Sequence, residues 1–388
     1  MSPAALNALP IVLAALVGAA LVSFILTPLT IRFAGQLGAI DEPDSHRRVH
    51  QRPIPRTGGL AVALSFVGVG LLGLLLNQAF GFAPPLRAVR TQEVVALFVG
   101  VAVGGLLGYL DDRLQLRARW QFIGQFVLAG VALVFGITID RLPNPFGDQP
   151  FMLGEIAAIA ATTLWIVGML NSVNFVDGLD GLLTGIALIA VITLGVISLV
   201  DPPIQPAVAV LCALLAGSLL GFLPYNFHPA RVFIGTAGVF AVGYALAVLS
   251  VLGTAKVALA LLVLGVPIID TFWIIIRRVL SRRSPFSADR GHFHHRLLDL
   301  GLGHRQAVLL IYGICSILAV VSLVLSGRGQ ISVFLIVVLG GGLLLYLLTR
   351  RAQESLDRRS YPEEGETELL EAIRGGSADT PTGREGDE

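Results

Sequence analysis

The sequence predicts an all-α polytopic membrane protein with about eleven transmembrane helices, its N-terminus outside and its C-terminus in the cytoplasm. Three observations predict this class. Hydrophobic residues make up 55% of the 388 residues and charged residues only 14%, whereas a water-soluble domain carries about 25% charged residues. The apolar residues fall into runs close to the roughly 20 residues that cross a bilayer as a helix. The basic residues lie mainly in alternate loops.

Each apolar run predicts one membrane span. In chain order the runs are 10–31, 58–76, 94–110, 122–139, 156–170, 181–200, 206–225, 237–253, 257–276, 306–326 and 331–348. Every span must be helical, because lipid offers no partner for unpaired backbone amides. Only the run 257–276 contains a charged residue, Asp270. An ionisable group inside a span is a functional candidate, although it could equally pair with an arginine of a neighbouring helix.

The distribution of Lys and Arg predicts which loops face the cytoplasm. With the N-terminus outside, the inside loops carry sixteen Arg and the outside loops five Lys or Arg, and loops rich in Lys and Arg stay inside. All seven histidines lie in the same inside loops. A transporter is expected to place its polar groups near the bilayer midplane. The pattern therefore favours an enzyme that works at the cytoplasmic interface.

The membrane domain is expected to cover residues 1–349, and residues 350–388 are expected to form a disordered acidic cytoplasmic tail. The tail holds eleven Asp or Glu and six Arg, a composition that cannot build a core. The formal net charge of +1 excludes a nucleic-acid-binding module, which needs a basic excess. Cys212 and Cys315 both lie in apolar runs and predict neither a disulfide framework nor a zinc site.

The second inside loop begins with two adjacent carboxylates, Asp111 and Asp112, at the end of an apolar span. Like charges this close raise each other's pKa unless a cation intervenes, and the C-terminal end of a helix disfavours negative charge. The alternative is a solvated helix end at which Arg113 neutralises one charge. We favour a functional site, because carboxylate and phosphate oxygens are the usual ligands of Mg²⁺.

The third inside loop carries four oxygen-bearing side chains at intervals of three residues: Asn171, Asn174, Asp177 and Asp180. On a helix this spacing places them on one face, where they could bind a metal or a nucleotide. The alternative is a polar turn between two spans, which would not need so regular a stripe.

Two further inside loops suit phosphate or base recognition. The first ends in Pro55-Arg56-Thr57-Gly58-Gly59, where arginine and the start of a helix could bind phosphate; a loop that only fixes topology is the alternative. The fourth holds Asn226 and Phe233 before a Gly-x-x-Gly at 235–238. These residues could hold a flat base and let a phosphate approach the backbone, although alone they are a weak signal.

The fifth inside loop contains the string Asp289-Arg290-Gly-His292-Phe-His294-His295. Histidines beside arginines favour anions over zinc, and an imidazole near a phosphate can donate a hydrogen bond or a proton. A basic loop that touches anionic lipid is the alternative, but the string is too specific for that role.

In this order the motifs resemble those of the polyprenyl-phosphate N-acetylhexosamine-1-phosphate transferases, membrane enzymes of the glycosyltransferase 4 type. The resemblance runs from about residue 27 to 300. It includes Gly-x-x-Asp-Asp, Asn-x-x-Asn-x-x-Asp-Gly-x-Asp-Gly-Leu, Asn-x-x-Pro-Ala-x-x-Phe-x-Gly and His-x-His-His-x-Leu. The His-Phe-His-His form resembles the undecaprenyl-phosphate GlcNAc-1-phosphate branch rather than the muramyl-pentapeptide branch.

The resemblance implies transfer of a HexNAc-1-phosphate, in this branch GlcNAc-1-phosphate, from a UDP-sugar to undecaprenyl phosphate, with release of UMP. This is the first membrane step of cell-envelope glycan synthesis. The implied cofactor is Mg²⁺, with Mn²⁺ as a substitute. The implied setting is the bacterial inner membrane, with the active site on the cytoplasmic face, contact with membrane lipid, a homodimer, and no nucleic-acid partner.

The resemblance also implies residue roles. The catalytic residues would be Asp111, Asp112, His294 and His295. The metal would be held by Asp112, Asn174 and Asp177. The substrates would be bound by Arg56, Asn171, Asp180, Asn226, Phe233, Asp289, Arg290 and His292. Within this last set, Asp180, Asn226 and Phe233 would form the uridine pocket, and Arg290 and His292, together with the two catalytic histidines, would bind the pyrophosphate.

The chain departs from the family pattern in the fourth loop. The family motif there is Phe-x-Gly-Asp-x-Gly-Ser, and its Asp is a metal ligand. Here Thr236 and Val239 replace the Asp and the Ser. Losing an anionic ligand weakens a site for a hard cation. A catalytically impaired relative that binds lipid phosphate or nucleotide is therefore the alternative. A secondary transporter, suggested by the many spans and by Asp270, ranks third, because no internal repeat supports it.

Overall fold

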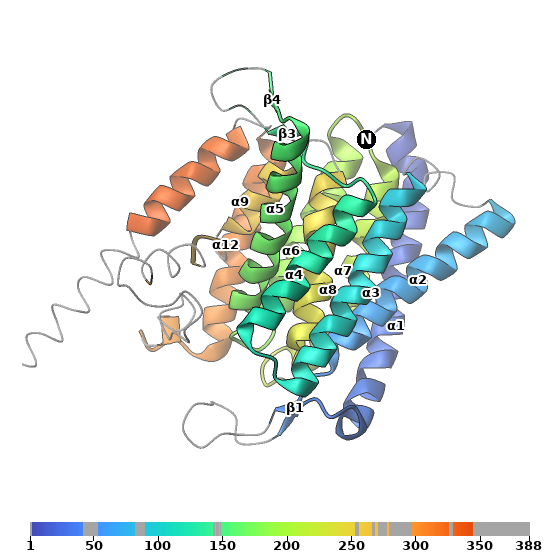
Figure 1. Cartoon of the computed structure of the whole chain (residues 1–388), viewed down its shortest axis with the longest axis vertical. Helices are drawn as coiled ribbons and strands as arrows, with labels where there is room; N and C mark the ends of the chain where they lie inside the picture. The colour runs from blue at the N-terminus through green and yellow to red at the C-terminus, as the bar shows by residue number, and fades with distance from the viewer. Residues whose placement is uncertain are drawn as a thin grey trace, which may run out of the picture. The chain divides into compact units, whose positions relative to one another are not determined.

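The computed structural model describes residues 2–41, 53–81, 90–142, 144, 147, 149–252, 256–265, 268–270, 278, 297–298, 300–325 and 329–343. The chain divides into a large compact unit, Met1–Ile336, and a second unit, Val337–Glu388. The helices and strands labelled in Figure 1 all lie in the large unit. The predicted tail, 350–388, lies outside the described residues.

The all-α polytopic class is confirmed. Eight helices are long and apolar enough to cross a membrane (Figure 1): α1 (Pro3–Leu37), α2 (Gly58–Phe80), α3 (Thr91–Leu114), α5 (Glu155–Val176), α6 (Leu182–Val200), α7 (Pro206–Asn226), α8 (Gly235–Leu252) and α12 (His304–Val324). The described residues also include three shorter apolar helices: α4 (Ala118–Val134), α9 (Lys256–Val263) and Gly329–Leu343. Each predicted span overlaps one of these helices.

Two short antiparallel hairpins, which the hydropathy pattern does not reveal, join neighbouring helices. Strand β1 (Ile40–Asp41) pairs with β2 (Ile54–Pro55) between α1 and α2. Strand β3 (Arg141–Leu142) pairs with β4 (Phe151–Met152) between α4 and α5. The two hairpins lie at opposite ends of the helices (Figure 1).

Helix α1 is longer than the predicted span 10–31, because capping residues rather than hydropathy set its ends. The hydroxyl of Ser2 accepts a hydrogen bond from the N–H of Ala5 at 3.2 Å. Gly38 ends the helix with φ of 68°, a conformation that glycine adopts without strain. Pro28 lies inside the helix without ending it, which membrane helices tolerate when neighbouring groups satisfy the freed backbone.

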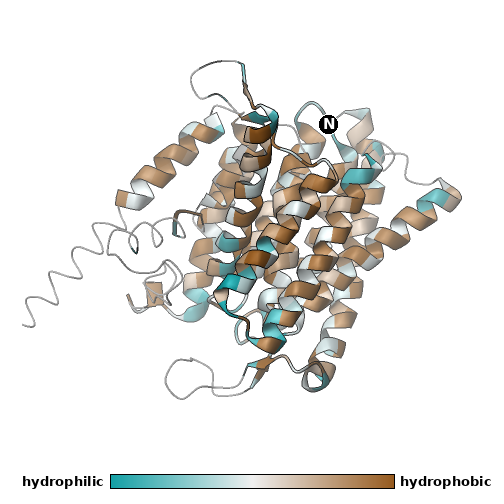
Figure 2. Ribbon diagram, in the orientation of Figure 1, coloured by the Kyte–Doolittle hydropathy of each residue, from teal (hydrophilic) through white to brown (hydrophobic). Residues whose placement is uncertain are grey.

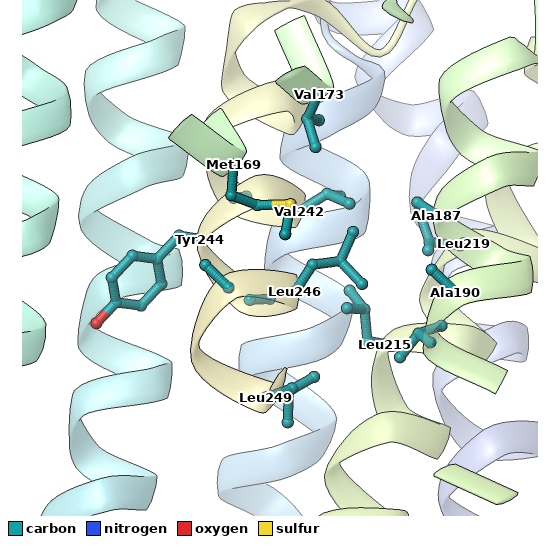
Figure 3. Packing of buried hydrophobic residues seen from close by; sticks show 14 of the residues in the cluster. Met169, Val173, Ala187, Ala190, Leu215, Leu219, Val242, Tyr244, Leu246 and Leu249 are labelled. Atoms are coloured by element: carbon teal, nitrogen blue, oxygen red, sulfur yellow. The ribbon is translucent and has the colours of Figure 1, made fainter. Parts of the chain in front are cut away.

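Helices α7 and α8 form the centre of the bundle. In each, 83% of the most apolar stretch is buried; α1 packs along α7 and α3 along α8. Side chains on Gly217 or Gly221 would overlap backbone carbonyls of α1, so these glycines let the two helices approach closely, as is common in membranes. Figure 3 shows buried residues of α5–α8, such as Met169, Leu215 and Leu246, packed together.

The outward faces of the helices are apolar. Large side chains such as Leu75, Phe126 and Val320 are exposed, as expected for a surface in contact with lipid tails. Figure 2 shows apolar residues along the helices and hydrophilic residues concentrated toward their ends. Asp111 and Asp112 also lie at a helix end, but their carboxylates are buried inside the bundle.

Candidate functional site

The candidate site lies where four of the loops predicted to be inside meet at one end of the bundle. Main-chain bonds tie the first loop to the fourth: the Phe233 N–H donates to the Pro55 carbonyl at 2.8 Å, and the Gly58 N–H donates to the Phe233 carbonyl at 3.0 Å. Side chains on Gly59 or Gly108 would overlap the backbone at the start of α8. These glycines therefore allow α2 and α3 to reach the N-terminus of α8.

Asp112 caps the N-terminus of α8. Its Oδ1 accepts a hydrogen bond from the Thr236 N–H at 2.9 Å, and its Oδ2 accepts one from the Ala237 N–H at 3.0 Å. Gly235, with φ of 65°, makes the turn that points these amides at the carboxylate. The positive end of a helix dipole stabilises a negative charge. The negative charge of Asp112 lies unfavourably at the C-terminal end of α3, and hydrogen bonds from the first N–H groups of α8 stabilise it.

Asp111 is held by a residue that the sequence analysis did not select. The side-chain amide of Gln121, near the start of α4, donates to Oδ1 and Oδ2 of Asp111 at 3.0 and 2.9 Å. Asp111 is itself only 6% exposed. A buried carboxylate needs such donors, so a search for donors within a helical turn or two of the loop would have found Gln121.

The four-residue stripe does not lie on one helical face, contrary to expectation. Helix α5 ends at Val176, so Asp177 caps it and Asp180 lies in the following turn. Asn171 is engaged inside the bundle, where its amide donates to Gln125 Oε1 at 2.7 Å. The half-buried Asn174 and the exposed Asp177 are therefore the members of the stripe best placed to meet a ligand.

Asp177 has a raised pKa. Its side chain reaches solvent, yet the protein around it limits hydration, and the carboxylates of Asp112 and Asp180 repel its charge. These effects outweigh the attraction of Arg56 and raise the pKa of Asp177 from 3.8 to about 7. Three carboxylates that interact in this way can be stabilised by a cation.

Arg56 is a cation that acts on the carboxylates of the site. Its guanidinium forms an ion pair with Asp41 Oδ1 at 3.0 Å across the β1–β2 hairpin, and it interacts electrostatically with Asp112 and Asp177. The side chain is 32% exposed. It can therefore contact a bound anion, as the sequence predicts.

Asp180 belongs to a network with two histidines. Its buried carboxylate oxygen Oδ2 accepts hydrogen bonds from His228 Nδ1 at 2.8 Å and from the Ala230 N–H at 3.1 Å. Its backbone N–H donates to His304 Nε2 at 3.0 Å. The sequence places both histidines on the inside face but gives no sign that they meet Asp180.

The same three residues could be considered as a metal site, since one ligand atom of each lies within 4.8 Å of the others. However, the rings of His228 and His304 stack with centroids 4.2 Å apart and an interplanar angle of 16°. Lone pairs in two nearly parallel planes do not converge on one ion, and Asp180 Oδ2, His228 Nδ1 and His304 Nε2 already take part in the hydrogen bonds above. The arrangement is that of a hydrogen-bond network.

Asn226 and Phe233 shape the fourth loop. The Asn226 amide donates to the Val232 carbonyl at 3.0 Å, and its oxygen accepts from the Thr184 hydroxyl at 2.6 Å. Because both ends of this buried amide have protein partners, Asn226 holds the loop that presents Phe233. Phe233 is half-buried at the same end of the bundle.

Some of the predicted site residues lie outside the described residues: Asp289, Arg290, His292, His294 and His295. Asp270 is described and buried near the end of its predicted span. The structure thus brings together the first four of the loops predicted to be inside and the start of α12, and the contribution of the fifth loop stays a prediction.

The chain is similar to known transferases. The model of glycosyl transferase family 4 matches residues 94–254. A "probable undecaprenyl-phosphate N-acetylglucosaminyl 1-phosphate transferase" of Bacillus subtilis is 38% identical over 322 residues, which cover 81% of this chain and 85% of the relative. A decaprenyl-phosphate N-acetylglucosaminephosphotransferase of Mycobacterium tuberculosis is 35% identical over 375 residues, covering 87% and 89%.

A phospho-N-acetylmuramoyl-pentapeptide-transferase of a Geobacillus species is 30% identical over 300 residues, covering 72% of this chain and 87% of the relative. The similarity to the N-acetylglucosamine enzymes extends over most of both chains. The chain therefore belongs to glycosyl transferase family 4, as a membrane phosphotransferase of the polyprenyl-phosphate N-acetylhexosamine-1-phosphate type.

Proposed function

We propose that the protein transfers GlcNAc-1-phosphate from UDP-GlcNAc to undecaprenyl phosphate and releases UMP. The observation that carries the proposal is the convergence of Asp111, Asp112 and Asp177 with Arg56 at one end of a membrane bundle. The names of the relatives above give undecaprenyl phosphate or decaprenyl phosphate as the lipid and phosphorylated N-acetylglucosamine as the group transferred. A lipid phosphate and a nucleotide sugar need a site at the membrane boundary, which this end of the bundle provides.

In the proposed reaction, an oxygen of the lipid phosphate attacks the sugar-bearing phosphorus of UDP-GlcNAc. A new P–O–P bond forms, the bond between the two phosphates of UDP breaks, and its electron pair leaves with UMP. The main barrier is repulsion between anions. Arg56 would offset this charge, and the α8 amides and Gln121 would hold Asp112 and Asp111 in fixed positions beside the lipid phosphate.

We propose Mg²⁺ as cofactor, with Mn²⁺ as a substitute. Hard oxygen ligands suit either ion, and Asp112, Asn174 and Asp177 would hold it. Mutual repulsion among the carboxylates around Asp177 fits a site that binds a cation. When bound, the ion would supply positive charge against the phosphates.

A second candidate function is a catalytically impaired relative that binds lipid phosphate or nucleotide. Thr236 supplies a neutral hydroxyl where the family motif has a carboxylate. In addition, Asp112 has protein donors on both oxygens, so part of the stabilisation that a cation would give is already present. Both features favour weaker metal binding than in a site with a fourth carboxylate.

A UMP-release assay tests the two candidates. Purified protein is mixed with undecaprenyl phosphate and either UDP-GlcNAc or UDP-GalNAc, with and without Mg²⁺. We expect UMP with UDP-GlcNAc in the presence of Mg²⁺, and faster release by Thr236→Asp. Absence of UMP from both proteins would reject the transferase and leave the binding function, which calorimetry with UDP-GlcNAc would then measure.

We also propose that the protein is a multi-pass protein of the bacterial inner membrane with its site on the cytoplasmic face. The excess of arginine in the loops at the site end supports this orientation. A homodimer in contact with membrane lipid is the proposed assembly, which light scattering in detergent would test.

A further inference from the structure

The start of α12 holds the turn between α5 and α6. His304, the first residue of α12, accepts the backbone N–H of Asp180 at 3.0 Å. Two turns further along, the Tyr312 hydroxyl donates to the Gly181 carbonyl. Positions eight apart lie close to the same side of a helix. One face of α12 therefore anchors two consecutive residues of this turn.

Helix α12 also contacts His228, the histidine that hydrogen-bonds to the Asp180 carboxylate. The His304 ring stacks on the ring of His228, with centroids 4.2 Å apart, and Arg305 Nε donates to the His228 carbonyl at 3.0 Å. His228 in turn donates from Nδ1 to Asp180 Oδ2 at 2.8 Å. The main chain and the carboxylate of Asp180 thus both depend on His304.

We propose that His304 is a positioning residue for the nucleotide of the UDP-sugar: it fixes Asp180 and the turn that follows it through one hydrogen bond and one stacked histidine. The proposal rests on the proposed function, in which Asp180 belongs to the uridine pocket. None of the residue roles that the family resemblance implies falls on α12. The lipid phosphate site is held by other elements, namely α8 and α4, so the effect of His304 should be confined to the nucleotide.

A histidine at this position combines two properties. Its Nε2 accepts the Asp180 N–H, which requires that the neutral ring carry its proton on Nδ1, and its flat face stacks on His228. Alanine removes both contacts and leaves a backbone N–H of a buried residue without this acceptor, which is more costly than losing an average hydrogen bond. Glutamine restores an acceptor oxygen but not the stacked ring.

The test compares His304→Ala and His304→Gln with a matched control, Gln306→Ala. The control removes a hydrogen bond at the same helix start, from the Gly303 N–H to Gln306 Oε1 at 2.8 Å, and the Gln306 side chain makes no hydrogen bond to Asp180. UMP release is measured while each substrate is varied separately. We expect His304→Ala to raise KM for UDP-GlcNAc about tenfold. KM for undecaprenyl phosphate and kcat should stay within about twofold, His304→Gln should be intermediate, and the control should match wild type.

Equal changes in both KM values, or a folded His304→Ala variant with wild-type KM, would overturn the proposal. So would a folded His304→Gln variant without any rescue. If size-exclusion chromatography shows that the alanine variant does not fold, the glutamine variant and the control decide by the same criteria. If wild type releases no UMP, calorimetry with UDP replaces the kinetics: weaker binding by the variants supports the role of His304 although transfer has failed, and no binding by wild type overturns both.

Discussion

At the scale of single residues, the two adjacent carboxylates are buried next to each other but are stabilised differently. Asp112 accepts one backbone N–H on each oxygen, whereas Asp111 accepts both of its hydrogen bonds from the one side-chain amide of Gln121. Removing the charge from each should therefore have different effects on stability. Both substitutions should still reduce activity if both carboxylates face the lipid phosphate.

Asp112→Asn is expected to destabilise the protein more than Asp111→Asn. The new amide of the first variant has only one acceptor oxygen for two N–H donors of α8, so a buried donor is left unsatisfied at a cost of about 1–3 kcal/mol. The second variant would keep a carbonyl oxygen that accepts from Gln121. Thermal unfolding in detergent measures the difference, and UMP release should fall in both variants. Equal unfolding temperatures for the two variants would show that Asp112 does not cap α8.

The raised pKa of Asp177 predicts that metal binding depends on pH. Its pKa is raised from 3.8 to about 7 by limited hydration and by Asp112 and Asp180. A divalent ion binds the ionised form, so below pH 7 a proton must leave when the ion binds. Affinity for Mg²⁺ should then fall as the pH is lowered below 7 and level off above it. Calorimetry in buffers of different ionisation enthalpy measures the affinity and the proton release.

The control is Asp177→Asn, which should bind Mg²⁺ more weakly and lose this proton release. Wild-type affinity that is flat between pH 5.5 and 8 would contradict the assignment of Asp177 as a titrating ligand.

At the scale of elements, the site depends on how closely α3 approaches the start of α8. The approach occurs at Gly108, where a side chain would overlap the Thr236 carbonyl. The hydrogen bonds from Thr236 and Ala237 to Asp112 lie one helical turn away. Neither helix can move apart without breaking them, so packing and site geometry are coupled here.

Gly108→Ala should lower the stability by about 1–3 kcal/mol, as overpacking does, and should also reduce UMP release by displacing Asp112. Gly168→Ala is the matched control, since Gly168 lies on α5 with nothing within 4 Å of an added Cβ. Alanine is the better helix former, so this control should be as stable as wild type or more so. Comparable losses in the two variants would contradict the role given to the α3–α8 contact.

At the scale of the whole molecule, charge is divided between the two ends of the helices. Described arginines at the site end include Arg32, Arg56, Arg113, Arg117, Arg119, Arg231 and Arg305, whereas Arg90 and Arg141 belong to the opposite end. Lys and Arg in short loops favour retention in the cytoplasm. The site should therefore face the cytoplasm.

Cysteine labelling tests this orientation. In a variant lacking Cys212 and Cys315, single cysteines are introduced at the exposed positions Arg117 and Gln149, which α4 separates. In intact cells a membrane-impermeant maleimide should label position 149 and not 117. Labelling of both positions after lysis is the control for access. The reverse pattern in intact cells would place the site outside and would reject UDP-sugar as the donor.

The sequence alone determined the class of the protein, the approximate spans and the gathering of polar loops at one end. These features are local. In lipid each span must form its backbone hydrogen bonds within its own helix, and the length of the apolar run sets the length of that span. Asp111 and Asp112 could be selected from the sequence for the same reason. Two adjacent carboxylates at the end of an apolar span form an unusual pattern, and that pattern is contained within a few neighbouring residues.

The tertiary structure decided which groups stabilise these carboxylates and which residues hold Asp180 in place. Asp112 meets Thr236, and Asp180 meets His304, each across 124 residues of the chain. The end of α5 at Val176, which removes Asp177 and Asp180 from the helical face of Asn171 and Asn174, likewise became visible only in the structure. Such pairings follow from how whole helices pack, and helix packing depends on glycines and side-chain shapes on several elements at once, which no local pattern in the sequence records.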